Sequence, residues 1–500
     1  MTSRFLERPP TAVPCSWQDR LERFLASPWC WGLLLALGLA VRCRQYLFVN
    51  SYWYDESFLV IPVREHSFGE LLGPQPYHLV SPPLFLWLTR SLFELGGDGE
   101  LVMRLPAFLA GCAALFAMMA LARKVVGGTH AVWALALLVV GRHALLHSAE
   151  AHPYTMDMLL VTGILLATTC LLDPGVSRRT RLAAMGMLAL LAVIGPWLSF
   201  PSAFALGGAS FALAIALYRD GSRRAWLGWL GFNGIVAFSG AAMWWISGRH
   251  MYYPGMLEHW GPHGWNGFPD WHNPGAAIAW LLWRPCVIAN YGTRELGPLV
   301  VLLAILGGVA LARRSAALAA LLVTPFVLAF VAAILGKYPL ADRTVFFLLP
   351  CLWLLAACGI ASVAAWGRTH GRQLAWVGFA VIAWDLVWVG VRLVHPDARI
   401  DYRGAYEYVH AHREPDDLLW AQMTVVYHTY YGKDAPVLND RQFKAAIEHA
   451  KSRRVWTVWG ETRADLRRQF EAAGTRIVHR HHVSGLEILA FEPSGKVSAW

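Results

Sequence analysis

Two adjacent carboxylates, Asp55 and Glu56, follow the first long apolar stretch of the chain. Keeping carboxylates near lipid is costly unless they line a polar cavity, so a pair at a membrane exit is a candidate working site. The alternative is an ordinary solvated loop, because acidic residues are mostly exposed. Carboxylates can exchange a proton with a reacting hydroxyl group. The elements around the pair must decide between these two interpretations.

The composition indicates a membrane protein with a soluble tail. Of the 500 residues 56% are hydrophobic and only 15% are charged, which is outside the range of ordinary soluble domains. Apolar stretches fill the chain to about residue 394, after which polar sequence takes over. We therefore predict a cytoplasmic N-terminal segment (1–28), a transmembrane domain (29–394) and a soluble extracytoplasmic domain (395–500).

About eleven apolar segments are long enough to span a bilayer. We place them at 29–48, 101–122, 129–147, 155–172, 182–199, 202–218, 226–246, 296–312, 316–335, 344–364 and 374–394.

The charge pattern orients these spans. With the N-terminus inside, every predicted inner loop is basic, as the positive-inside rule requires. The odd number of spans then places the tail outside. The net charge of +10 is therefore explained by topology and does not indicate binding to nucleic acid. The inner-loop residues are Arg4, Arg8, Arg20, Arg23, Arg123, Lys124, Arg178, Arg179, Arg181, Arg219, Arg223, Arg224, Arg313, Arg314, Arg368 and Arg372.

Three further apolar segments are too short or too interrupted to span a bilayer. We expect 58–72, 83–96 and 276–289 to form amphipathic helices at the outer interface. Ionisable residues collect on this outer side, so we expect a cleft that opens to the outer face. They are Asp55, Glu56, His78, His147, Glu150, His152, Lys337, Asp342 and Arg343.

Neither cysteine nor histidine spacing predicts a metal site. The eight cysteines are scattered singly, without a Cys-x-x-Cys pair, and are interpreted as small core residues. The histidines of the third outer loop are spaced by 9, 4 and 9 residues, which matches no zinc pattern, and the surrounding Trp and Gly residues suit sugar stacking better. These histidines are His250, His259, His263 and His272.

The tail is predicted to form a small α/β domain. Alternating periodicities predict helices at 403–414, 442–453 and 465–473, and strands at 418–422, 455–459, 476–482 and 486–491. Tyr427, Tyr430 and Tyr431 could bind a glycan, but core packing explains them better.

Five short motifs stand in a fixed order along the predicted outer side. They are Trp53-Tyr-Asp-Glu56, His78-Leu-Val-Ser-Pro-Pro-Leu-Phe-Leu86, Arg104-Leu-Pro106, Ser148-Ala-Glu-Ala-His-Pro-Tyr154 and Tyr338-Pro-Leu-Ala-Asp-Arg343. In this order, and with the topology above, the chain resembles the GT-C glycosyltransferases. Within them it resembles the bacterial branch related to the protein O-mannosyltransferases and the lipid A aminoarabinose transferase. The resemblance covers nearly the whole chain.

The resemblance implies an inverting glycosyltransferase that needs neither metal nor cofactor. It would move a sugar from a polyprenyl-phosphate donor to a protein, lipid or envelope-glycan acceptor at the outer face of a bacterial inner membrane. The absence of a Gly-x-Gly-x-x-Gly motif agrees with a lipid-linked donor. The alternative is a transporter or flippase of a lipid-linked or anionic substrate. Transporters usually carry internal repeats, which are not evident here.

The resemblance also assigns roles to individual residues. Asp55 is the expected general base and Glu56 its adjacent partner. Arg343 is expected to hold the donor phosphate, because a guanidinium can bind phosphate in a bidentate fashion. In two places the chain departs from the family, with Ser81 where relatives have His before Pro-Pro, and His152 where they have Arg. The other expected phosphate ligands are Lys337, Arg104 and His152, and the expected cleft residues are Trp53, His78, Glu150 and Tyr154.

Overall fold

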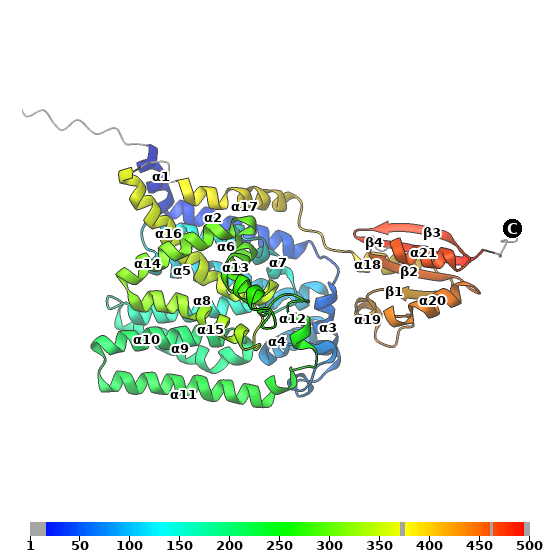
Figure 1. The fold of residues 1–500 in the computed structure, drawn as a ribbon, viewed down its shortest axis with the longest axis horizontal. Coiled ribbons are helices and arrows are strands. Elements are labelled where there is room, and N and C mark those ends of the chain that lie inside the picture. The colour runs from blue at the N-terminus through cyan, green and yellow to red at the C-terminus, as the bar shows by residue number, and fades with distance from the viewer. Residues whose placement is uncertain (1–16, 371–375, 461–463, 495–500) are drawn as a thin grey trace, which may run out of the picture.

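The computed structural model describes residues 17–370, 376–460 and 464–494. Long helices lie side by side in one body, and a small α/β domain lies beyond one end of them (Figure 1). Of the predicted inner-loop residues, Arg4, Arg8 and Arg372 lie outside the described residues.

The helices match the predicted spans in number and position. Within the described ranges nine helices are long and apolar enough to cross a membrane, and two bent helix pairs bring the number to eleven. The bent pairs are α1 (Trp17–Ala26) with α2 (Pro28–Leu47), and α6 (Val132–Val140) with α7 (Arg142–Leu146). The others are α5 (Glu100–Val125), α8 (Tyr154–Leu172), α9 (Arg178–Leu198), α10 (Ser202–Asp220), α11 (Arg223–Ile246), α13 (Pro274–Thr293) with α14 (Gly297–Arg314), α15 (Ala316–Ile334), α16 (Leu349–His370) and α17 (Val377–Val394).

The short helices of the first outer loop form close to their predicted positions. α4 (Pro83–Gly96) has the predicted bounds, and its Arg90 forms an ion pair with Glu94 one turn later. α3 (Tyr54–Glu65) starts four residues before the predicted helix 58–72, so that Asp55 and Glu56 belong to its first turn. It also ends seven residues before the predicted end, and Glu70–Leu72 forms a separate 3₁₀ turn. The Glu56 side chain caps this turn by accepting a hydrogen bond from the Trp53 backbone amide at 3.0 Å.

The predicted helix at 276–289 is longer than expected. α13 begins at Pro274 after the Asn273 side chain, which accepts a hydrogen bond from the Ala276 amide. The 3₁₀ turn Arg294–Leu296 joins it to α14, and together they form one candidate span of 41 residues. The charge of Arg284 does not interrupt it, because the guanidinium lies over the Trp280 ring and donates to the Asn266 carbonyl oxygen.

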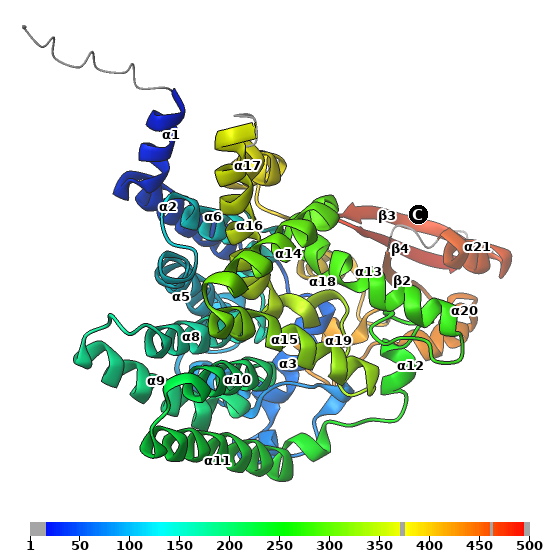
Figure 2. The same ribbon diagram turned by 60° about the vertical axis from the view of Figure 1, so that its left-hand side comes forward.

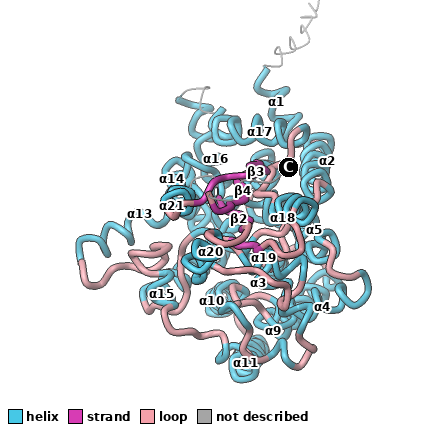
Figure 3. The backbone as a smooth tube through the Cα atoms, turned by 90° about the vertical axis from the view of Figure 1, so that its right-hand side faces the viewer, coloured by secondary structure: helices cyan, strands magenta, loops and turns pink. Residues whose placement is uncertain are grey.

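The C-terminal domain contains a four-stranded sheet with the order β1-β2-β4-β3 (Figure 1). Figures 2 and 3 show β2, β4 and β3 from two other sides. Only β1 and β2 are parallel. The predicted helices and strands all form, and one further helix, α19, was not predicted from the sequence. The elements are α18 (Tyr402–His412), β1 (Leu418–Ala421), α19 (Thr424–Tyr431), α20 (Phe443–Ala450), β2 (Val455–Gly460), α21 (Ala464–Ala472), β3 (Thr475–Val483) and β4 (Leu486–Pro493).

Helix α19 connects the C-terminal domain to the first predicted outer loop through hydrogen bonds. Arg64 of α3 donates hydrogen bonds to the carbonyl oxygens of His428 and Thr429 at the end of α19. The Tyr430 hydroxyl accepts from the Tyr52 amide at 2.7 Å and donates to the Glu100 carboxylate at 3.0 Å. Tyr427 therefore packs in the core and Tyr430 forms this docking contact, whereas Tyr431 is exposed.

Candidate active site

Asp55 forms an ion pair with Arg343. Asp55 lies in the first turn of α3, whereas Arg343 lies in the 3₁₀ turn Asp342–Leu348 that leads into α16. The Asp55 side chain is 8% exposed and that of Arg343 is 25% exposed. The structure thus joins a carboxylate and a guanidinium from predicted outer loops that are far apart in sequence, and the Arg343 side chain stays partly exposed.

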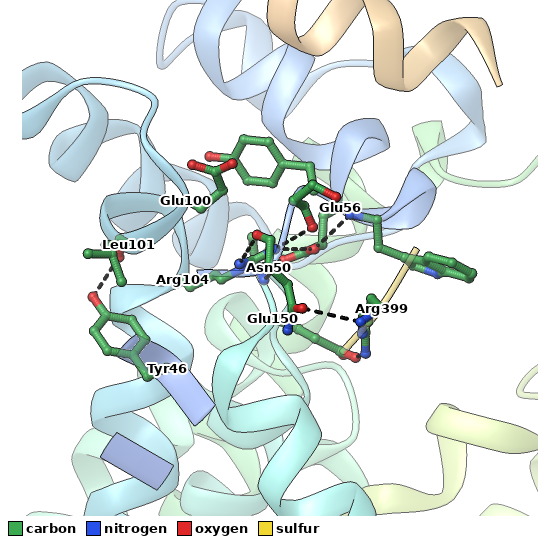
Figure 4. A network of polar contacts seen from close by, with 12 residues as sticks. Tyr46, Asn50, Glu56, Glu100, Leu101, Arg104, Glu150 and Arg399 are labelled. Carbon is green, nitrogen blue, oxygen red and sulfur yellow. Dashed lines mark hydrogen bonds and ion pairs between the residues drawn. The ribbon is translucent and has the colours of Figure 1, made fainter. Parts of the chain in front are cut away.

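Glu56, the next residue, is bound to Arg104 (Figure 4). Two bonds of 2.8 Å join the Glu56 carboxylate to Nε and Nη2 of Arg104. The carboxylate also accepts hydrogen bonds from the backbone amides of Trp53 and Ala151. Burial alone would raise the pKa of Glu56, but the Arg104 guanidinium outweighs it and lowers that pKa to about 2. Glu56 is therefore held as a permanent carboxylate.

The Arg104 guanidinium, like the Glu56 carboxylate, forms several hydrogen bonds. Its side chain is 3% exposed. Besides Glu56 it donates to the carbonyl oxygens of Asn50 at 2.8 Å and Ser51 at 3.1 Å. The pair fixes the segment before α3 onto α5 and the second outer loop. From the sequence, Glu56 was expected beside Asp55 as its partner and Arg104 as a phosphate ligand. In the structure these two side chains bind each other.

Glu150 forms the second partly exposed ion pair of the site, with Arg399 (Figure 4). It also shares a 2.6 Å hydrogen bond with Nδ1 of His147, whose Nε2 lies 2.6 Å from the Tyr291 hydroxyl. Arg399 belongs to the linker between α17 and α18. No motif marks it in the sequence, because a lone arginine after the last span is ordinary in a polar linker.

His152 is buried and stacks on Tyr154, with ring centroids 5.1 Å apart. Burial lowers the pKa of His152 to about 4, although the nearby Glu56 carboxylate opposes the shift. Its imidazole is therefore neutral at pH 7. A neutral imidazole can still contribute a hydrogen bond, but it does not replace the permanent charge of the arginine that related sequences have at this place.

The remaining predicted residues lie around the site in different ways. Trp53 caps α3, and its ring lies 5.7 Å from the guanidinium carbon of Arg399. His78 is exposed and stacks on Tyr253 of the third outer loop at 4.5 Å, so it bridges two outer loops. Lys337 is exposed, and none of the described residues forms an ion pair with it.

The histidines of the third outer loop are all exposed. Among the described residues no group of three or more His, Cys, Asp or Glu side chains is arranged to hold a metal ion.

Comparisons with known proteins show which solved structures share the fold of this chain. No protein-family profile and no curated protein sequence matches the chain. Among solved structures, apo ArnT from Cupriavidus metallidurans has a TM-score of 0.55 at 13% identity, over 92% of this chain and 97% of that one. The same protein bound to undecaprenyl phosphate has a TM-score of 0.53 at 13% identity, with the same coverage. The chain therefore shares its overall fold with ArnT.

A second GT-C structure agrees with this. The archaeal oligosaccharyltransferase AglB from Archaeoglobus fulgidus, in complex with an inhibitory peptide and a dolichol-phosphate, has a TM-score of 0.51 at 12% identity over 95% of this chain and 74% of that one. At such identities the likeness concerns the arrangement of the chain. In this chain the Asp55–Arg343 pair joins the first and fourth predicted outer loops, and the Glu150–Arg399 pair joins the second to the linker after α17.

Proposed function

We propose that this chain is an inverting glycosyltransferase that takes a sugar from a polyprenyl-phosphate donor. The acceptor would be a protein, a lipid or an envelope glycan at the outer face of a bacterial inner membrane. In this topology the N-terminus lies in the cytoplasm and the soluble domain lies outside, on the same side as Asp55 and Arg343. The GT-C fold supports the reaction class.

One observation carries the proposal, namely the Asp55–Arg343 pair at the outer end of the helices. The reaction needs a base for the acceptor hydroxyl and a cation for the departing phosphate, and the pair holds one of each in contact. The Arg343 side chain is more exposed than that of Asp55, so an anion can reach it first. Once a phosphate binds Arg343, the Asp55 carboxylate loses its partner and becomes free to accept a proton.

The transfer step balances with these two groups. Asp55 takes the proton of the acceptor hydroxyl as that oxygen forms a bond to the anomeric carbon. The bond between the anomeric carbon and the phosphate oxygen breaks, and its electron pair leaves with the polyprenyl phosphate. Arg343 compensates the charge that grows on this phosphate. Attack opposite to the leaving group inverts the anomeric configuration.

The test compares Asp55→Asn with Asp98→Asn in cells that lack the native protein. Envelope glycans and lipids are analysed by mass spectrometry with and without the native chain, which identifies the modified acceptor. We expect Asp55→Asn to reduce that product by about 10²–10⁴-fold, the usual contribution of a general base. Asp98 is a matched control, because it is a half-exposed carboxylate of the same outer loop, paired with Arg64 outside the site.

Both possible failures are informative. Normal product formation by Asp55→Asn, at normal protein level, would refute the assignment of Asp55 as base. If the native chain alters no glycan or lipid but moves a lipid-linked or anionic solute across the membrane, the transporter alternative is correct. The GT-C fold would then serve transport here.

A further inference from the structure

The side chains of Arg343 and Arg399 are more exposed than that of Arg104. Arg104 is sealed by Glu56 and two carbonyl oxygens, with a 3% exposed side chain. Arg343 and Arg399 are 25% and 23% exposed, and each has a carboxylate as its ionic partner. A buried and saturated guanidinium is structural, whereas a partly exposed one can exchange its partner for a ligand anion.

Both exposed guanidinium groups reach the same turn of the chain. Arg343 pairs with Asp55, and Arg399 lies over the ring of Trp53, two residues earlier at the start of α3. The start of α3 also carries the positive end of the helix dipole, which favours anions. The two arginines therefore both contact the first residues of α3, Arg343 through Asp55 and Arg399 through Trp53.

The linker that carries Arg399 is held rigidly against the same segment. The Gln45 side chain both donates to and accepts from the backbone of Asp397, at 3.0 and 2.8 Å. Asn50 repeats this pattern, donating to the Asp397 carbonyl oxygen and accepting from the Arg399 amide at 3.2 Å. The Ser51 hydroxyl donates to the Ile400 carbonyl oxygen. The backbone of Arg399 is thus fixed beside the catalytic turn, and only its side chain needs to move.

Glu150 can release Arg399 without being left as an unpaired buried charge. Its other carboxylate oxygen keeps the 2.6 Å hydrogen bond with His147, and His147 in turn contacts Tyr291. Because a carboxylate that loses its only partner in a buried site is costly, this second hydrogen bond lowers the cost of exchange.

We propose that Arg399 is a second ligand of the donor phosphate, which Glu150 occupies until the donor binds. This inference rests on the proposed function and deepens it. The donor phosphate is a diester with one negative charge, whereas the leaving polyprenyl phosphate gains a second charge as the sugar departs. A second guanidinium therefore stabilises the transition state more than the bound donor. Since Arg399 belongs to the linker, the soluble domain's attachment forms part of the phosphate site.

The experiment measures binding of undecaprenyl phosphate to the full-length protein in detergent or nanodiscs. Arg399→Ala should weaken binding by about 10- to 100-fold, as expected for loss of a charge-assisted hydrogen bond, and Arg399→Lys by less. Glu150→Gln removes the competing carboxylate and should tighten binding several-fold. That gain should vanish in the double variant Glu150→Gln/Arg399→Ala. The matched control is Arg403→Gln, because Arg403 pairs with Glu100 in the domain-docking contact, outside the site.

The outcomes separate this inference from the proposed function. If native protein binds undecaprenyl phosphate and Arg399→Ala binds it equally well, Arg399 is only a docking residue and the inference is wrong. A Glu150→Gln variant that does not bind more tightly also counts against it, even if Arg399→Ala fails to fold. If the native protein binds no undecaprenyl phosphate, the polyprenyl-phosphate donor itself is wrong and both proposals fall.

Discussion

The role of Glu56 can be tested by removing its charge while keeping its shape. Glu56→Gln leaves Arg104 as a buried cation whose remaining partners are the carbonyl oxygens of Asn50 and Ser51. Breaking a buried ion pair on one side typically costs about 3–5 kcal/mol. At roughly 2 °C per kcal/mol for a large domain, the unfolding temperature should fall by about 6–10 °C. Arg104→Met, which leaves the Glu56 carboxylate unpaired, should cause a similar loss.

The assay records thermal unfolding of the purified full-length protein and product formation per folded molecule. Asp98→Asn, which breaks an exposed pair, should change stability by no more than about 1 kcal/mol. We expect folded Glu56→Gln to retain most of its turnover, whereas Asp55→Asn should lose turnover and retain stability. A Glu56→Gln variant that unfolds like the native protein but forms no product would refute this reasoning and return Glu56 to the catalytic role.

Three further predictions follow from the geometry. Because the pKa of His152 lies at about 4 in the folded chain and near 6.5 when unfolded, its protonation should remove up to about 3 kcal/mol of stability as pH falls from 6.5 to 4, and His152→Gln should flatten unfolding-temperature profiles over that range. Lys337→Gln should change product formation by less than about 10-fold, because it is Arg343, and not Lys337, that pairs with the Asp55 carboxylate. A loss as large as that of Arg343→Ala would make Lys337 the main phosphate ligand. An extracytoplasmic reporter enzyme fused at Trp500 should be active and one inserted near Arg179 silent, and the reverse pattern would invert the topology.

Much of the architecture could be predicted from the sequence because it follows from local physics. A bilayer requires about twenty apolar residues for each helical span, and the composition of each segment reports this directly. Basic loops indicate orientation for the same reason, since Arg and Lys residues mark the inner side. The helix 83–96 and the four strands of the tail were predicted for a similar reason, because their residue periodicity reflects which face is buried.

Local patterns misjudged elements whose form depends on contacts with distant segments. α13 was predicted as a short interfacial helix because Arg284 interrupts its apolar run. In the structure this charge is satisfied by Trp280 and Asn266, so the helix continues. Helix α19 was not predicted at all, and it is held in place by contacts with Arg64 and the first outer loop.

The partners of the charged site residues were decided by the tertiary structure alone. The adjacent residues Asp55 and Glu56 look equivalent in sequence, yet one faces Arg343 at the site and the other is locked to Arg104. Successive side chains of a helix are about 100° apart, so neighbours in sequence meet different surroundings. Arg399 enters the site only because the linker folds back onto the segment before α3. The sequence by itself therefore determined which residues could do chemistry, whereas the pairing of their charges arose from long-range packing.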